Sequence, residues 1–231
     1  MLSAPFRSLV ASASAALIAA GSPLAAESCS LALSFGLDIS VSVDPEEYRL
    51  QREGLAAALS DPEVAQLIES QPGGVALMAY EWSGEHQQSV VVPWQLVETE
   101  AGVRRFAQRL VDYPPISHFY PTALGRAVGF GLIALDQQTQ CDRLVLDMSG
   151  DGANNDGYPP KSAYRYFPVT NVTVNGLVVR GSDDEVLRYY AENLIYGQGA
   201  FVEVADGFED YERAMKRKLL REIGVAMVAQ N

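Results

Sequence analysis

Two kinds of hydrophobic pattern alternate along the chain. Short, nearly continuous apolar runs predict strands, and apolar residues that recur every three or four positions predict amphipathic helices. Within residues 122–137, for instance, Leu124, Val128, Leu132 and Leu135 fall on one helical face. The expected strands are 30–38, 74–82, 88–94, 141–151, 171–179 and 200–205, and the expected helices are 44–59, 60–70, 99–113, 122–137, 183–195 and 208–228.

This alternation predicts a mostly parallel sheet that helices cover on both faces. Residues 74–82 and 88–94 are separated by a short polar link with Gly84, which is a hairpin signal. Pro93 lacks an N–H group and therefore suits an edge strand. We expect a doubly wound α/β domain, with a mostly parallel six-stranded sheet and one antiparallel edge strand. In such folds ligands bind beyond the carboxyl ends of the strands.

The first residues have the pattern of a secretory signal peptide. Arg7 precedes the apolar stretch 9–20, and small residues follow up to Ala26. We therefore expect residues 1–26 to be a cleaved signal peptide and residues 27–231 to form one domain of ordinary size. No other apolar run approaches 18 residues, so we expect no membrane span in the mature chain. The expected location is the periplasm or the extracellular space.

The charge balance narrows the classes of partner. The sequence contains 17 Lys and Arg residues against 29 Asp and Glu residues, which gives a formal net charge of −12. Nucleic acids and anionic membrane surfaces attract basic proteins, so neither is expected as a partner. The acidity also has a simpler consequence, which is good solubility.

Oxygen-bearing side chains gather where predicted strands end. In "GLDISVSVD", Asp38, Ser40 and Ser42 occupy alternate positions, which places them on one side of an extended chain. Thr122 opens a later predicted helix, and Asp151 ends a later strand in "MSGDG". Each has an ordinary explanation alone, as a solvated turn residue or a helix cap. Together they offer two carboxylates and three hydroxyls, ligands that favour Mg²⁺, Mn²⁺ or Ca²⁺ over zinc.

The order of these residues resembles a known motif. "DISVS", a later threonine and "SGDG" are similar to the metal-ion-dependent adhesion site (MIDAS) of von Willebrand factor A domains, which is Asp-x-Ser-x-Ser, then Thr, then Asp. The resemblance implies that Ser40, Ser42 and Thr122 bind Mg²⁺ directly, whereas Asp38 and Asp151 act largely through water. It also implies a protein partner that presents a carboxylate to the ion.

A narrower resemblance covers most of the mature chain. It lies in the segments "YRLQREGLAAAL", "EWSG", "VVVPW", "SGDGANNDG" and "VNGLVV". These look like a bacterial family of secreted A-type domains with no assigned function.

An enzymatic alternative rests on "GDGANND", which resembles the magnesium loop of haloacid dehalogenase-like phosphatases. Those enzymes need a nucleophilic aspartate and a second acid two residues later. Asp38 fits the nucleophile, but Ser40 occupies the position of the acid. The added asparagine also alters the loop spacing, and Asn154, Asn155 and Asp156 are expected to be turn residues. We therefore expect a binding module rather than an enzyme, with a scaffold whose metal site is idle as a third possibility.

The two cysteines precede the two aspartates by similar distances. Cys29 lies nine residues before Asp38, and Cys141 lies ten residues before Asp151. If both aspartates end neighbouring parallel strands, both cysteines lie near the opposite ends of those strands. An even pair of cysteines in an exported protein then predicts a disulfide, with two buried free thiols as the alternative.

Overall fold

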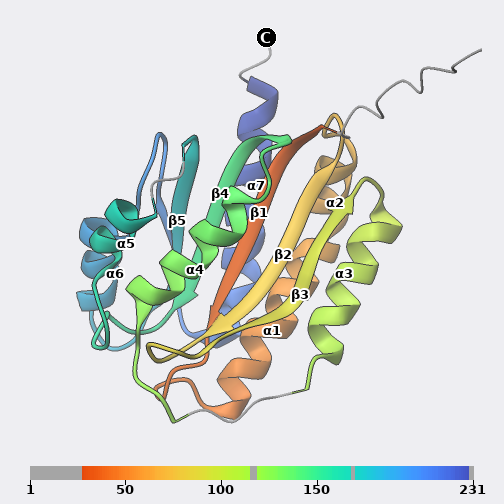
Figure 1. Ribbon diagram of the computed structural model, residues 1–231. Coiled ribbons are helices and arrows are strands. Elements are labelled where there is room, and N and C mark those ends of the chain that lie inside the picture. Colours follow the sequence, from red (N-terminus) through yellow and green to blue (C-terminus); the bar gives the residue numbers. More distant parts are fainter. Residues whose placement is uncertain (1–27, 115–118, 168–169, 229–231) are drawn as a thin grey trace, which may run out of the picture.

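The computed structural model describes residues 28–114, 119–167 and 170–228, with side chains through 224. The expected signal peptide lies outside these residues. Six strands form one sheet in the order β3-β2-β1-β4-β5-β6, and only β3 is antiparallel to its neighbour (Figure 1). The strands are β1 (Cys29–Asp38), β2 (Val75–Trp82), β3 (Gln88–Val97), β4 (Cys141–Gly150), β5 (Val172–Val179) and β6 (Val202–Ala205). The predicted topology is confirmed, and Pro93 lies in the edge strand β3.

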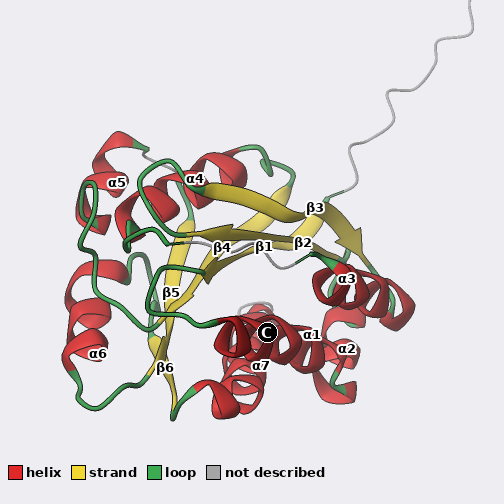
Figure 2. Cartoon of the chain, turned by 90° about the horizontal axis from the view of Figure 1, so that it is seen from below, coloured by secondary structure: helices red, strands yellow, loops and turns green. Residues whose placement is uncertain are grey.

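Helices cover both faces of the sheet (Figure 2). One face carries α1 (Pro45–Ser60), α2 (Pro62–Glu69), α3 (Glu100–Asp112) and α7 (Tyr211–Val228), which follows a short 3-10 turn (Phe208–Asp210). The other face carries α4 (Leu124–Asp136), α5 (Pro160–Tyr166) and α6 (Glu185–Tyr189), which continues into a π-helical turn (Tyr190–Leu194). Helix α5 was not predicted, because its seven residues are too few to show a helical period. No helix in the described part of the chain is long and apolar enough to cross a membrane.

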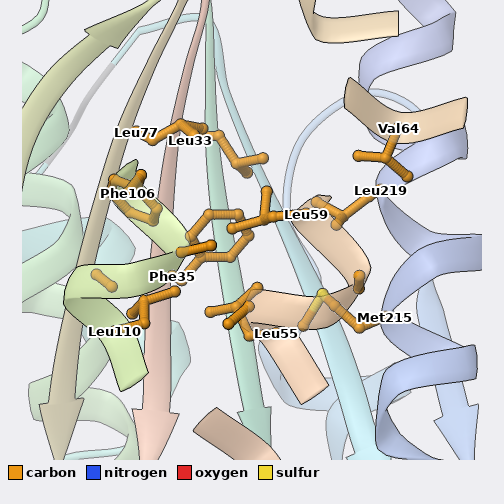
Figure 3. Close-up of a cluster of buried hydrophobic side chains, with 14 of the residues drawn as sticks. Leu33, Phe35, Leu55, Leu59, Val64, Leu77, Phe106, Leu110, Met215 and Leu219 are labelled. Atoms are coloured by element: carbon orange, nitrogen blue, oxygen red, sulfur yellow. The ribbon is translucent and has the colours of Figure 1, made fainter. Parts of the chain in front are cut away.

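Strand β1 lies at the centre of the sheet and is buried along its whole length. Its residues Leu31, Leu33, Phe35 and Leu37 belong to the core that it forms with α1, α3 and α7 (Figure 3). On the opposite face, a Cβ at Gly36 would lie 2.8 Å from both the Tyr80 hydroxyl and the Met148 sulfur. The glycine therefore leaves room for Tyr80, whose hydroxyl donates to the Ala127 carbonyl of α4 at 2.8 Å. This contact helps hold α4 against the sheet.

The turn after β1 ends in a well-defined helix start. Asp44 accepts hydrogen bonds from the backbone N–H groups of Glu46 and Glu47, and Glu47 Oε2 accepts one from the Asp44 N–H. This capping box, together with Pro45 in the first turn, fixes where α1 begins. The short segment between β1 and α1 is therefore held at its α1 end.

The predicted disulfide is confirmed. Cys29 and Cys141 are directly paired in the register of β1 and β4, with 4.4 Å between their Cα atoms, and their sulfurs are bonded. The bond lies at the amino ends of these strands. It links residues 112 apart in the sequence, at the end of the sheet opposite Asp38 and Asp151.

Candidate metal centre

The five predicted site residues meet at the carboxyl edge of the sheet. β1 and β4 are neighbours in parallel register, with Leu37 opposite Ser149. Asp38 is the last residue of β1, and Asp151 follows directly after β4. Ligand sites in doubly wound sheets form at such an edge.

The hydroxyls and one carboxylate form a continuous hydrogen-bonded chain. The Thr122 hydroxyl donates to Ser40 Oγ at 3.2 Å, and Ser40 Oγ lies 3.3 Å from Ser42 Oγ. The Ser42 hydroxyl donates to Asp151 Oδ1 at 2.7 Å. Four of the five predicted residues are thus in direct contact, although they come from three separate segments of the chain.

Asp38 lies beneath this chain and is completely buried. Its Oδ1 accepts a hydrogen bond from the Ser40 N–H at 2.7 Å, whereas its Oδ2 has no hydrogen-bond partner. Burial and the nearby charge of Asp151 raise the pKa of Asp38 to about 8. Burial also raises the pKa of Asp151. A buried carboxylate with a free oxygen beside a second carboxylate is stabilised by a cation, so the residues fit a bound metal ion.

A glycine brings a tyrosine close to Asp38. A Cβ at Gly150 would lie 2.6 Å from Asp38 Oδ2 and 2.6 Å from the Tyr190 hydroxyl, closer than a side chain allows. Tyr190 is fully buried, and its hydroxyl has no hydrogen-bond partner. Burial, together with the nearby Asp38, raises the pKa of Tyr190 well above its ordinary value. Position 150 therefore requires glycine for the site to keep this shape.

Gln51 of α1 holds the backbone of Asp38 in place. Its Nε2 donates to the Asp38 carbonyl at 2.8 Å, and its Oε1 accepts from the Asp38 N–H at 3.2 Å. The Ser149 hydroxyl donates to the same Oε1 at 3.2 Å and pairs with the Tyr211 hydroxyl at 2.8 Å. Sequence reasoning missed Gln51, because a single glutamine within a helix carries no signal of a contact with a strand.

Two asparagines after Asp151 hold the segment that contains Thr122 and the start of α4. Asn155 Oδ1 accepts from the Thr122 N–H at 2.8 Å, and Asn154 Oδ1 accepts from the Gly125 N–H at 2.9 Å. Helix α4 begins at Leu124, so Thr122 lies two residues before its first turn rather than within it. Thr122 is therefore not the helix cap; Asn154 binds the first-turn amide from a different loop.

The set of donors determines which ions suit the site. It contains two carboxylates and three hydroxyls. Among the described residues, no three His, Cys, Asp or Glu side chains form a cluster suited to a metal. Asp38, Ser40 and Thr122 are buried, whereas Ser42 is exposed. Hard oxygen donors suit Mg²⁺, Mn²⁺ or Ca²⁺. The exposed side leaves an approach for an oxygen from outside.

Several solved structures share this fold. Proximal thread matrix protein 1 from the mussel byssus has a TM-score of 0.60 at 15% identity, over 86% of this chain and 49% of the mussel chain. A von Willebrand factor type A protein from Catenulispora acidiphila has a TM-score of 0.59 at 15% identity, over 85% and 43%. The pilus adhesin SpaC from Lactobacillus rhamnosus GG, in an open conformation, has a TM-score of 0.61 at 12% identity, over 84% and 30%.

The chain thus spans half or less of the length of these proteins, and the likeness is one of fold. Another structure of the mussel protein holds zinc in its MIDAS motif. No curated protein sequence matches the chain. The family described as "Protein of unknown function (DUF1194)" matches residues 28–227. The chain therefore belongs to the DUF1194 family, and its fold is that of a von Willebrand factor A domain.

Proposed function

We propose that this protein is an exported binding module that engages an acidic group of a partner protein through a bound Mg²⁺ ion. Ser40, Ser42 and Thr122 would hold the ion through their hydroxyl oxygens. Asp38 and Asp151 would balance its charge, largely through water. When bound, the ion supplies an electrophilic site for one further oxygen ligand.

One observation carries this proposal. Asp38 Oδ2 is fully buried and has no hydrogen-bond partner, close to a second carboxylate and three hydroxyls. An unpaired buried carboxylate is costly in a fold that does not use it. A cation at this position would remove that cost and the repulsion between Asp38 and Asp151.

The charge balance supports a carboxylate as the outside ligand. Two aspartates formally neutralise one divalent ion, and the three hydroxyls add no charge. If the aspartates act through water, the ion remains electrophilic. The exposed position of Ser42 leaves that ion open to solvent on one side. A partner carboxylate is the hard, anionic oxygen ligand that such an ion prefers.

The phosphatase alternative has less support from the site. Ser40 occupies the position where that mechanism needs an acid, and its hydroxyl contacts Ser42 and Thr122. Asn154 and Asn155 bind backbone N–H groups of the α4 segment and so have a structural role. An assay with a generic phosphate ester tests this alternative directly. Asp38→Asn, which lacks the proposed nucleophile, is the control.

The disulfide supports an exported location, because disulfides persist in oxidising compartments such as the periplasm and the extracellular space. The binding proposal is tested by immobilising the protein and passing over it periplasmic and secreted bacterial proteins in Mg²⁺. We expect a protein that is retained in Mg²⁺, released by chelator and absent with Thr122→Ala. Retention that chelator leaves unchanged would contradict the proposal.

A further inference from the structure

Large apolar side chains lie beside the candidate metal centre. Val41, between two of the predicted ligands, is 62% exposed, and Phe119 and Tyr120 are 84% and 45% exposed. We call these three residues the apolar rim. They are three of the nine exposed large apolar side chains in the described part of the chain. Single exposed apolar residues are common, but a group beside a ligand site indicates a contact surface.

The apolar rim is held in position by the backbone of the site. The Val41 N–H donates to the Tyr120 carbonyl at 2.9 Å, which joins the loop after β1 to the segment that leads into α4. A Cβ at Gly84 would lie 3.1 Å from the Tyr120 Cβ, so the loop after β2 passes close to Tyr120. Val41 and Tyr120 are therefore fixed next to Ser40 and Thr122.

Beyond the apolar rim the surface is acidic. Besides the proposed ligand Asp151, segments 39–47, 83–87, 119–123 and 151–159 contain five Asp and Glu residues and no Lys or Arg. Two of these acids are paired with arginines outside the segments, Glu46 with Arg49 of α1 and Glu85 with Arg126 of α4. The loops around the site thus keep an excess of negative charge after these two ion pairs are counted.

This charge restricts which carboxylates can bind. A bound divalent ion is formally neutralised by its own two aspartates, so the surrounding acids still repel an approaching anion. Exposed charges act over about 8 Å at physiological ionic strength, which is the scale of one loop. A partner overcomes the repulsion if Lys or Arg residues surround its metal-binding acid.

We propose that the partner segment has an acidic residue flanked by apolar side chains, with Lys or Arg residues further out. The acid would bind the metal, the apolar neighbours would pack on the apolar rim, and the basic residues would face the acidic loops. This inference rests on the proposed metal-dependent binding.

The test is a selection from a displayed library of random heptapeptides. Peptides are bound in Mg²⁺ and eluted with EDTA. We expect the eluted peptides to be enriched in Asp or Glu, with aliphatic or aromatic residues adjacent and an excess of Lys and Arg. Enriched acidic peptides without these neighbours would overturn the inference but leave the metal-dependent binding intact. A complete absence of EDTA-eluted peptides would overturn both.

Matched variants test the apolar rim itself, with the most enriched peptide as the probe. Val41→Ser and Phe119→Ser should each weaken binding at least tenfold and leave the stabilisation by Mg²⁺ unchanged. Ile133→Ser and Tyr166→Ser, at exposed apolar positions elsewhere, should bind as wild type does. Raising NaCl from 50 to 300 mM should also weaken binding. Equal affinities for rim and control variants would overturn the proposal.

Discussion

The Ser42 hydroxyl donates a hydrogen bond to Asp151 Oδ1 at 2.7 Å, across 109 residues of sequence. This contact joins the turn after β1, four residues beyond Asp38, to Asp151 in the loop after β4. The contact exists because β1 and β4 are parallel neighbours that end at the same edge.

Removing the Ser42 hydroxyl should lower the Mg²⁺ affinity much more than it lowers the stability of the fold. Ser42→Ala deletes the partly solvated hydrogen bond to Asp151 and the longer contact with Ser40 Oγ, so we expect a loss of about 1 kcal/mol in the free energy of unfolding. It also deletes a proposed metal ligand, so Mg²⁺ affinity should fall at least tenfold. Urea denaturation and calorimetric titration measure the two effects. Ser60→Ala, at an exposed helix end, is the control; equal Mg²⁺ affinities for the two variants would contradict the assignment.

Position 150 should tolerate no side chain. In Gly150→Ala the new methyl group would lie 2.6 Å from Asp38 Oδ2 and from the Tyr190 hydroxyl. We expect a destabilisation of about 1–3 kcal/mol from this overpacking, together with weaker Mg²⁺ binding. Gly181→Ala is the matched control, because the methyl group that it adds would meet no atom within 4 Å apart from its chain neighbours. Thermal unfolding with and without Mg²⁺ compares them, and equal melting temperatures would be inconsistent with the described packing.

The buried carboxyl group of Glu81 in β2 should make the stability of the fold depend on pH. Burial raises its pKa from 4.5 to about 7, although the nearby Tyr48 hydroxyl and the charge of Arg52 act to lower it. Because the pKa is higher in the folded state, ionised Glu81 destabilises the fold; this cost is absent below pH 4.5 and complete above pH 7. The free energy of unfolding of Glu81→Gln relative to that of wild type should therefore rise by about 3 kcal/mol as the pH is raised from 4 to 8. Urea denaturation at several pH values measures the difference, and a pH-independent difference would refute the expectation.

The disulfide should contribute a large part of the stability. Cys29 and Cys141 close a loop of 112 residues, and chain entropy gives about 4–5 kcal/mol for a loop of this size. Thermal unfolding of wild type should therefore shift to lower temperature on reduction, whereas the Cys29→Ser, Cys141→Ser double variant should not respond to reductant. A wild-type transition that reductant leaves unchanged would contradict this contribution.

Much of the fold followed from the sequence because its signals are local or topological. The alternation of strand and helix patterns predicted the layers, and the capping signals of Asp44 and Pro45 predicted where α1 begins. The position of Cys29 and Cys141 relative to the two aspartates predicted that they pair. The five oxygen ligands came from one motif and its order along the chain.

Other features could not be predicted, because they depend on contacts between distant segments. The contacts of Gln51 with the Asp38 backbone require the packing of α1 on β1. The contact of Asn154 with α4 requires two loops to meet, so a threonine before a helix looked like its cap when viewed alone. The need for Gly150 follows only from the position of Tyr190.

If the cluster around Asp38 binds a divalent metal ion, Mg²⁺ should stabilise the fold. The shift in melting temperature on addition of Mg²⁺ is measured in wild type and in Asp38→Ala. At 100 times the dissociation constant, linkage gives about 2.7 kcal/mol of added stability. For a chain of this size that corresponds to a rise of roughly 5–10 °C. We predict this rise in wild type and none in Asp38→Ala; no shift in wild type, or equal shifts in both proteins, would contradict metal binding by this cluster.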